Sequence, residues 1–244
     1  MNTMLAFVAA AGLAGGALTM QAIDRVSGSA APDAIQVADD GDTGALAPRR
    51  IIIGLDLSKS NPLIENPAFA SKVAVRIANE VKKLGFASEV HVRTFGNFDA
   101  SSNTFYFDTV ISTRARPDNV AAEIQKLVSG TPLLVQRGKW VAQDSTNIVA
   151  FLDNAVSSIG CSGMPTTVIL ASDGIEDSEY ARLNREDSRL PPPAGHPFRG
   201  CAELQILGVG QGTRSPVETM RLRTQWMRWA QDAGFSHNTI LNDW

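Results

Sequence analysis

A run of apolar, mostly β-branched residues at positions 51–57, with the sequence IIIGLDL, constrains the fold of this chain most. Such a run predicts a strand that is buried on both faces, as in the centre of a parallel sheet. Segments 166–171 (TTVILA) and 203–209 (ELQILGV) have the same character. The chain is therefore predicted to fold around a mostly parallel sheet.

Segments with helical periodicity separate the predicted strands. Apolar residues recur at helical spacing in 67–84, 117–129, 144–159 and 216–233. Asn66 followed by Pro67 is typical of a helix N-terminus. Strands that alternate with helices indicate an α/β fold, here a doubly wound, mostly parallel central sheet with helices on both faces.

The predicted strands 89–95 and 104–111 are separated by a segment too short for a crossover helix, which predicts one antiparallel edge strand. We interpret 131–143 as irregular and 176–190 as a polar helix. The polar face of the last helix is interpreted first as solvated surface and second as a partner patch. Its members are Arg221, Gln225 and Arg228.

The N-terminal segment is predicted to lie outside the domain. Residues 5–22 carry no charge and are rich in Ala, Gly and Leu, so 1–26 is interpreted as a signal peptide or an N-terminal membrane anchor. Residues 27–48, rich in Ala, Asp, Gly and Pro, are predicted to be a flexible acidic linker before a domain at 49–244. We expect an exported protein, periplasmic, secreted or tethered to the membrane through residues 5–22.

Oxygen-bearing side chains follow the predicted strands. Asp56, Ser58 and Ser60 alternate after the first strand, and Asp173 follows a later one. Thr146 lies near the start of a helix. Because ligands of such sheets bind beyond the carboxyl ends of the strands, these side chains are candidates for one site. Oxygen ligands suit a hard divalent cation.

Each of these pieces also has a simpler interpretation. The Asp-x-Ser-x-Ser pattern occurs in turns that cap a following helix. Thr146 could serve only as an N-cap, and Asp144 or Ser145 could take its place. The net charge of −3 argues against a nucleic-acid-binding protein, which usually carries a basic excess.

Together, the pattern Asp-x-Ser-x-Ser after a strand, a Thr before a helix and Asp-Gly after a later strand resembles the von Willebrand factor A (vWA) domain family. The resemblance covers about residues 49–244 and implies a vWA/Rossmann-like fold with a metal-ion-dependent adhesion site (MIDAS). The metal ligands that it implies are Asp56, Ser58, Ser60, Thr146 and Asp173.

The resemblance also implies a function. The cation expected is Mg²⁺, with Mn²⁺ or Ca²⁺ as alternatives, and a partner protein would supply an Asp or Glu carboxylate to it. We therefore expect a metal-dependent protein-binding module, for adhesion or as a scaffold, in the cell envelope or outside the cell. The sequence departs from the family at Asn61, often a Met there, at Lys59, and in the long segment 175–200.

An enzyme is the alternative from a different class. A Mg²⁺-dependent hydrolase or phosphotransferase would use Asp56 and Asp173, but Ser58 stands where such an enzyme would carry a second carboxylate. No general base or nucleophile constellation is recognisable in the sequence. We therefore predict that the chain is not an enzyme.

The two cysteines, Cys161 and Cys201, each precede a predicted strand. In the sheet order that the resemblance implies, these strands are neighbours, so a disulfide between the two is expected. Export would permit it. Two free thiols are the alternative, favoured in a cytosolic protein.

Overall fold

The computed structural model describes residues 46–97, 105–213 and 215–244. The strands are β1 Arg50–Asp56, β2 Glu89–Phe95, β3 Tyr106–Val110, β4 Thr166–Ala171, β5 Cys201–Leu207 and β6 His237–Leu241. The helices are η1 Pro62–Ile64, α1 Pro67–Lys82, α2 Pro117–Ser129, α3 Thr131–Gln136, α4 Ile148–Ser158 and α5 Pro216–Ala233. The predicted segment 1–26 and most of the predicted linker 27–48 lie outside the described residues.

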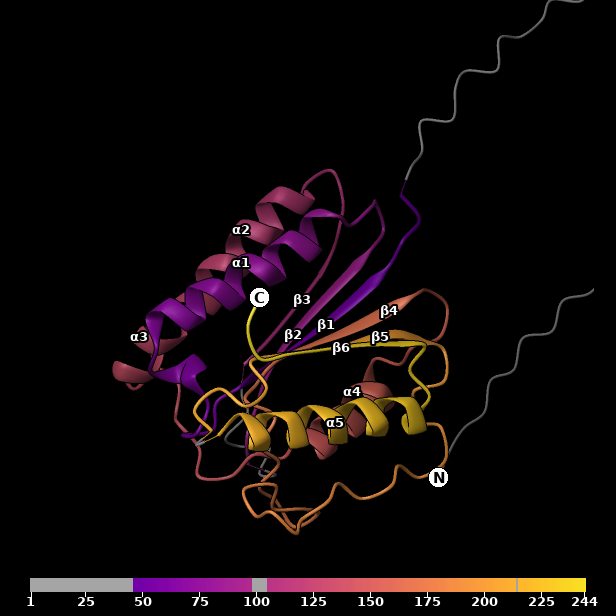
Figure 1. Ribbon diagram of the computed structural model, residues 1–244. Coiled ribbons are helices and arrows are strands. Elements are labelled where there is room, and N and C mark those ends of the chain that lie inside the picture. The colour runs from indigo at the N-terminus through magenta and orange to yellow at the C-terminus, as the bar shows by residue number, and fades with distance from the viewer. Residues whose placement is uncertain (1–45, 98–104, 214) are drawn as a thin grey trace, which may run out of the picture. The chain divides into compact units, whose positions relative to one another are not determined.

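Strand β1 lies at the centre of a six-stranded sheet with the order β3-β2-β1-β4-β5-β6 (Figure 1). It is buried along its whole length and pairs in parallel with β2 and with β4. Within the described part of the chain, every neighbouring pair is parallel except β2 with the edge strand β3. The predicted mixed α/β fold with a mostly parallel sheet and one antiparallel edge strand is confirmed.

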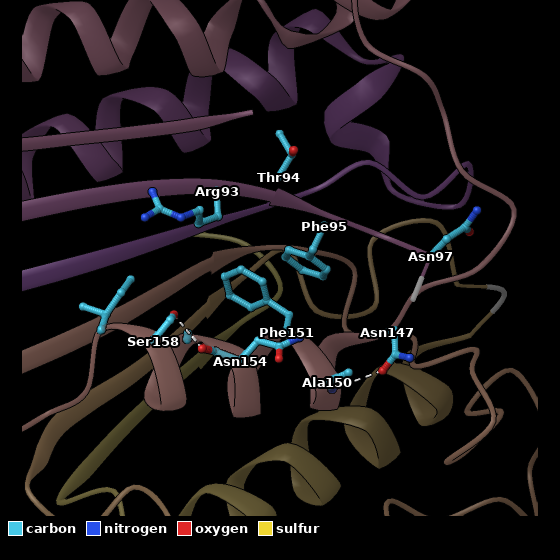
Figure 2. A pocket seen from close by; sticks show the side chains of 11 residues that line it. Arg93, Thr94, Phe95, Asn97, Asn147, Ala150, Phe151, Asn154 and Ser158 are labelled. Atoms are coloured by element: carbon cyan, nitrogen blue, oxygen red, sulfur yellow. Dashed lines mark hydrogen bonds between the residues drawn. The ribbon is translucent and has the colours of Figure 1, made fainter. Parts of the chain in front are cut away.

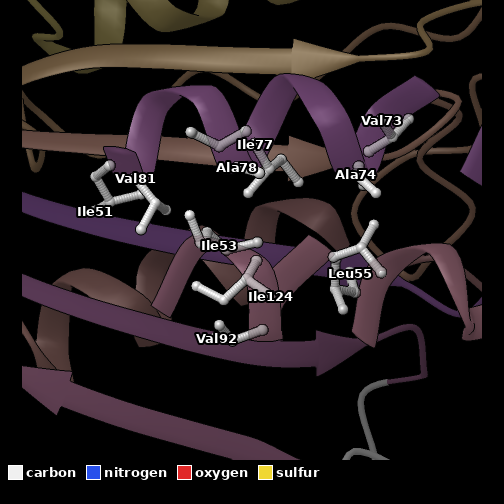
Figure 3. Packing of buried hydrophobic residues seen from close by; sticks show 14 of the residues in the cluster. Ile51, Ile53, Leu55, Val73, Ala74, Ile77, Ala78, Val81, Val92 and Ile124 are labelled. Carbon is white, nitrogen blue, oxygen red and sulfur yellow. The ribbon is translucent and has the colours of Figure 1, made fainter. Parts of the chain in front are cut away.

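Helices cover both faces of the sheet (Figure 1). Alternate residues of β1 point to opposite sides: Ile53 packs in the cluster formed with α1 and α2, and Ile52 in the cluster formed with α4 and α5. Figure 3 shows the first cluster, where Ile77 of α1 and Ile124 of α2 meet Ile53. Burial on both faces explains why β1 has no polar residue between Arg50 and Asp56.

The structure differs from the predictions in three elements. Strand β6 was not predicted, and α3 occupies part of a segment interpreted as irregular. The predicted polar helix 176–190 is wrong, because these residues form no helix. Instead, the backbone of Asp177 pairs with Thr146, and the Leu183 N–H donates to the Glu176 carbonyl at 2.8 Å. A backbone pairing with Thr146 and a bond within the segment itself thus replace helical hydrogen bonds.

The polar face of α5 makes contacts with the rest of the protein that were not predicted. The Gln225 side chain accepts a hydrogen bond from the Leu190 N–H at 3.0 Å, and Arg221 Nη2 donates to the Leu183 carbonyl at 2.5 Å. The interpretation of these two residues as solvated surface is wrong, because the segment after β4 lies against them. Of the three, Arg228 remains exposed.

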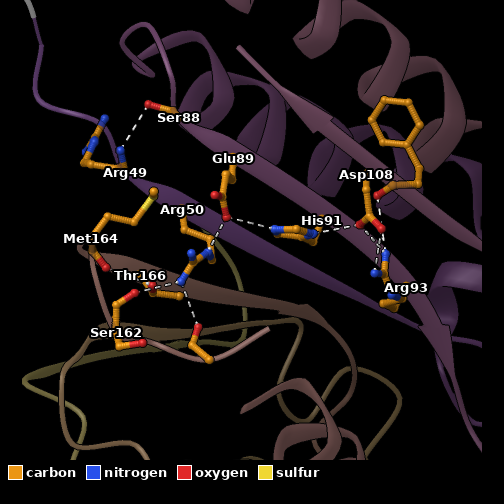
Figure 4. A network of polar contacts seen from close by, with 12 residues as sticks. Arg49, Arg50, Ser88, Glu89, His91, Arg93, Asp108, Ser162, Met164 and Thr166 are labelled. Carbon is orange, nitrogen blue, oxygen red and sulfur yellow. Dashed lines mark hydrogen bonds and ion pairs between the residues drawn. The ribbon is translucent and has the colours of Figure 1, made fainter. Parts of the chain in front are cut away.

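A polar network runs across β1, β2 and the edge strand β3 (Figure 4). Arg50 Nε binds Glu89 Oε2 at 2.6 Å, and His91 Nδ1 lies 2.7 Å from Asp108 Oδ1. Arg93 donates to both carboxylate oxygens of Asp108. The network links β1, β2 and β3, from Arg50 at the amino end of β1 to Arg93 in the second half of β2. The His91 side chain is only 16% exposed, because this network encloses it.

The described residues contain no helix that is both long enough and apolar enough to cross a membrane. The proposed tether at residues 5–22 lies outside the described residues and stays a prediction.

The predicted disulfide between Cys161 and Cys201 is present, with 5.0 Å between the two Cα atoms. Cys201 begins β5, where it pairs with Thr166 of β4. The disulfide therefore closes a loop that contains β4 and the segment after it, across a sequence separation of 40 residues.

Replacing both cysteines by serine is expected to lower the free energy of unfolding by about 4 kcal/mol, because the unfolded chain regains the entropy of an open loop. Urea unfolding of the Cys161→Ser/Cys201→Ser variant and of the wild type, each with and without reductant, measures this. Reductant should destabilise the wild type and leave the variant unchanged. Equal midpoints for the oxidised wild type and the variant would contradict the prediction.

Candidate metal site

The end of β1 delivers Asp56 into the interior, where its side chain is fully buried. Asp56 Oδ1 accepts a hydrogen bond from the Ser58 N–H at 2.8 Å, and Oδ2 accepts one from the Ser172 hydroxyl at 2.7 Å. The chain turns at this point, so that the hydroxyl oxygens of Ser58 and Ser60 lie 3.3 Å apart. The first loop therefore gathers its three predicted oxygen side chains in one place.

Asp173 follows β4, the strand beside β1, and is also fully buried. Its Oδ1 accepts a hydrogen bond from the Ile175 N–H at 2.9 Å. Its Oδ2 is buried and has no hydrogen-bond partner among the described residues. The Asn61 side-chain amide donates to the carbonyls of Asp56 and Ala171, at 2.8 and 3.0 Å. This amide joins the loop after β1 to the end of β4.

Backbone hydrogen bonds bring the segment of Thr146 to the same edge of the sheet. The Gln143 N–H donates to the Leu57 carbonyl, and the Lys59 N–H donates to the Gln143 carbonyl. Thr146 is buried and exchanges two backbone hydrogen bonds with Asp177, at 3.1 and 2.9 Å. All three predicted segments therefore meet at the carboxyl ends of β1 and β4.

Thr146 does not cap α4, and neither does Asp144 or Ser145. The helix begins at Ile148, and its N-cap is Asn147, whose side-chain oxygen accepts from the Ala150 N–H at 3.1 Å. The simpler interpretation of Thr146 as an N-cap is therefore wrong.

The two aspartates have raised pKa values. Burial raises the pKa of Asp56 to about 6, against hydrogen bonds from Ser172 and Ser58 that lower it. Burial and then the charge of Asp56 raise the pKa of Asp173 to about 7, against the hydrogen bond from the Ile175 N–H and the nearby Ser60 hydroxyl, which lower it. Ser172, which precedes Asp173 in the chain, binds Asp56 Oδ2, so the two carboxylates lie close together, and each disfavours the charge of the other.

A third buried carboxylate, Glu176, was not predicted. Its Oε2 accepts hydrogen bonds from the N–H groups of Ile148 and Val149, at 2.8 and 3.1 Å, and Ser178 donates to its Oε1. Burial raises its pKa to about 7, and Asp56 adds to the rise. Glu176 satisfies the first N–H groups of α4, which is a structural role.

No cation is paired with Asp56, Asp173 or Glu176 within the described residues. Lys59, the cation inside the first loop, points away and binds the exposed Asp144 at 2.5 Å. Buried carboxylates without a cation are energetically costly when ionised. A divalent cation beside Asp56 and Asp173 would offset that cost and give Asp173 Oδ2 a partner.

The candidate metal site offers few charged ligands. The described residues contain no group of three His, Cys, Asp or Glu side chains arranged to hold a metal ion. A cation here would depend on two carboxylates and on hydroxyl oxygens. Mg²⁺ accepts such a set, because it usually keeps several waters and uses one or two carboxylates.

A separate cavity of about 210 Å³ lies between β2 and α4 (Figure 2). Phe95 and Phe151 stack in it with ring centroids 4.5 Å apart. No carboxylate lines this cavity, so it does not belong to the candidate metal site. The stacked rings hold α4 against β2 and thereby help to position the segment before the helix.

Three supporting residues escaped the sequence-based search: Asn61, Ser172 and Glu176. Asn61 and Ser172 directly adjoin predicted site residues, so their polarity at a buried position was the available signal. Glu176 had no local signal, because the N–H groups that it accepts from lie 27 and 28 residues earlier in the chain.

No family model matches this chain, and no curated protein matches it. Among solved structures it is similar to a point mutant of the PilB minor pilin from Streptococcus sanguinis, with 9% identity and a TM-score of 0.42. It is also similar to the pilus adhesin SpaC from Lactobacillus rhamnosus GG, with 14% identity and a TM-score of 0.43. Each match covers 80% of this chain, but only 57% and 29% of the other.

These findings correct the family assignment. The resemblance to the vWA family is wrong as an assignment, because neither a family model nor a curated protein supports it. Neither description names an enzyme.

In the absence of metal, the protein is expected to lose stability as pH rises from about 4 to about 7. The folded state raises the pKa values of Asp56, Asp173 and Glu176, so it binds more protons than the unfolded chain in this window. Urea unfolding in EDTA at pH 5, 6, 7 and 8 measures the trend.

The Asp173→Asn variant is the control, since one titrating group is removed and the slope against pH should become shallower. A hydrogen bond from Arg50 lowers the pKa of Glu89, and one from Arg93 lowers the pKa of Asp108. Their contribution to the stability of the folded state is therefore lost only at pH values below this range. A metal-free stability that increases between pH 5 and pH 8 would contradict the assignment of raised pKa values.

Proposed function

We propose that this chain is a metal-dependent protein-binding module of the cell envelope or exterior. The observation that carries the proposal is the buried Oδ2 of Asp173, which has no hydrogen-bond partner within the described residues and lies beside the equally buried Asp56. A buried polar atom of this kind is rare in proteins and calls for a ligand or a functional explanation.

In this proposal Asp56, Ser58, Ser60, Thr146 and Asp173 hold one divalent cation, Mg²⁺ first, with Mn²⁺ and Ca²⁺ as alternatives. The two carboxylates balance the charge of the ion. The hydroxyl groups add ligands without charge, so the bound ion retains affinity for a further anion. Hard cations of this type prefer oxygen ligands throughout.

The further anion in this proposal is an Asp or Glu carboxylate of a partner protein, taking the place of a metal-bound water. The chain's own residues bind and orient the ion, and burial in the protein excludes water from the side opposite the partner. The backbone of the loops is held by Asn61 and by the pairing of Thr146 with Asp177, so the ligand oxygens are positioned before a partner arrives.

The disulfide supports an exported location, because such bonds persist mainly in oxidising compartments. The hydrolase alternative has less support. Both oxygens of Asp56 accept hydrogen bonds and the side chain is fully buried, which is unfavourable for a nucleophile. We therefore propose binding, and not catalysis, as the role of the site.

Adding Mg²⁺ to the metal-free protein at pH 8 is expected to raise the melting temperature, because the ion binds the folded state alone. At a hundredfold excess over the dissociation constant, the gain is about 2.7 kcal/mol, or roughly 5–10 °C for a domain of this size. Thermal unfolding measures it, with Mn²⁺ and Ca²⁺ in parallel.

The variant that should lose this response is Asp173→Asn, which keeps the shape of the side chain. The matched control is Asp144→Asn, which removes an exposed carboxylate bound to Lys59 and should respond as the wild type does. An unchanged melting temperature of the wild type in all three metals, confirmed by calorimetric titration, would refute the metal site.

Partner binding is expected to need both the metal and a carboxylate. Immobilised protein should retain partners from an envelope or surface extract in Mg²⁺ and release them in EDTA. Blocking carboxylates of the extract with a carbodiimide and glycinamide should abolish retention, whereas acetylating its lysines should not. Equal retention by the wild type and by Asp173→Asn, in Mg²⁺ and in EDTA, would show that the partner does not use this site.

A further inference from the structure

A second surface of the molecule has the character of a binding site. An open groove of about 470 Å³ runs along the outer side of α5, beside the end of the segment that follows β4. Its lining includes Arg189, Val217, Met220, Arg221 and Arg228. The groove is distinct from the candidate metal site, because the two share no residue.

The charged side chains that line the groove are all arginines, although the whole chain has a net charge of −3. No acidic side chain is part of the lining. Arg189, Arg221 and Arg228 take part in none of the ion pairs of the described residues. Arg189 and Arg228 are exposed, so their positive charge is available to an anionic ligand, and the half-buried Arg221 adds positive charge beside them.

Two of the arginines are held in place by backbone carbonyls. Arg189 Nη1 donates to the carbonyls of Glu186 and Ser188, both at 2.8 Å. Arg221 Nη2 donates to the Leu183 carbonyl at 2.5 Å. Because these side chains are already ordered, a carboxylate that binds them loses less entropy than it would with mobile partners.

Apolar side chains complete the groove at the first turns of α5. Val217 is 79% exposed and Met220 is 66% exposed. Single exposed apolar residues are common, but these lie next to each other on the helix, three positions apart, and beside arginines. Methionine also adapts its shape to different apolar partners. The surface thus combines a fixed anion-binding side with an adaptable apolar side.

We propose that this groove binds an acidic, partly apolar segment of a partner protein. Its carboxylates pair with the arginines, whose planar guanidinium groups match carboxylates in geometry, and its apolar side chains lie against Val217 and Met220. The concave shape favours a peptide segment over the flat surface of an anionic membrane. This binding does not use the metal, so it does not rest on the proposed function.

The test is a selection of random 12-residue peptides displayed on phage, against the full-length wild-type protein in EDTA. Peptides that also bind the Arg228→Glu variant are removed. The expected outcome is enrichment of sequences that contain at least two acidic residues together with apolar ones. No enrichment, or enrichment of basic or uncharged sequences, would overturn the proposal.

Enriched peptides are then synthesised with a fluorophore, and their affinity is measured by fluorescence anisotropy in EDTA. Arg228→Glu should weaken binding by at least about tenfold, and Met220→Ser several-fold. Arg137→Glu, an equal charge reversal at an exposed position beyond α3, should leave the affinity unchanged. Urea midpoints equal to that of the wild type show that the variants are folded.

Two further measurements separate the alternatives. Vesicles of equal parts phosphatidylglycerol and phosphatidylcholine should not bind the wild type; binding that Arg228→Glu abolishes would identify a membrane surface and overturn the proposal. Asp173→Asn should bind the selected peptides as the wild type does. Loss of peptide binding in this variant would place the peptides at the metal site instead of the groove.

Discussion

Strand β1 has apolar contacts on both faces and a paired strand on each side, so its last residue emerges inside the protein and not at its surface. This burial places Asp56 in an environment that disfavours its charge and raises its pKa to about 6. The parallel neighbour β4 brings Asp173 to the same place by the same means. The polar site is thus a direct consequence of a hydrophobic sheet whose parallel strands end together.

The protein offsets part of the cost of these buried carboxylates with local donors. Asp56 and Glu176 have both oxygens in hydrogen bonds, from Ser58 and Ser172 in the first case and from α4 and Ser178 in the second. Asp173 has one oxygen left without a partner among the described residues. The folded state is therefore less stable than it would be if every buried oxygen had a hydrogen-bond partner. A ligand that binds this oxygen would raise the free energy of unfolding.

The sequence predicted those features that depend on short-range patterns. The buried strands, Asn66 as the N-cap of α1 and the antiparallel edge pair are all present. The cysteine pairing is also present, but it was expected from the sheet order that the family resemblance implies. Strand β6 was missed, because only Ile240 of its residues is buried and its place depends on pairing with β5.

Failures concentrate where a residue's partner lies far away in the sequence. Residues 176–190 are polar, which led to the prediction of a surface helix. Glu176 is nevertheless buried, because its carboxylate accepts hydrogen bonds from the N-terminus of α4. The N-cap of α4 is Asn147, one residue after the candidate that the sequence offered. The family name failed for a different reason, since a short pattern of Asp, Ser and Thr identifies a chemical arrangement and not a lineage.

Hydrogen bonds to other segments hold the backbone of the loop that carries Asp173. The Asp173 carbonyl accepts from the Gly210 N–H at 2.8 Å, and the Gly174 carbonyl accepts from Trp226 Nε1 at 2.7 Å. Gly174 has a positive φ of 72°, and a Cβ there would lie 3.1 Å from Val209, so a larger residue would disturb the loop. Because the backbone is bound to the β5–α5 connection and to α5, the loop holds Asp173 in one position. In the proposed metal site, such preorganisation would lower the entropy cost of binding a cation.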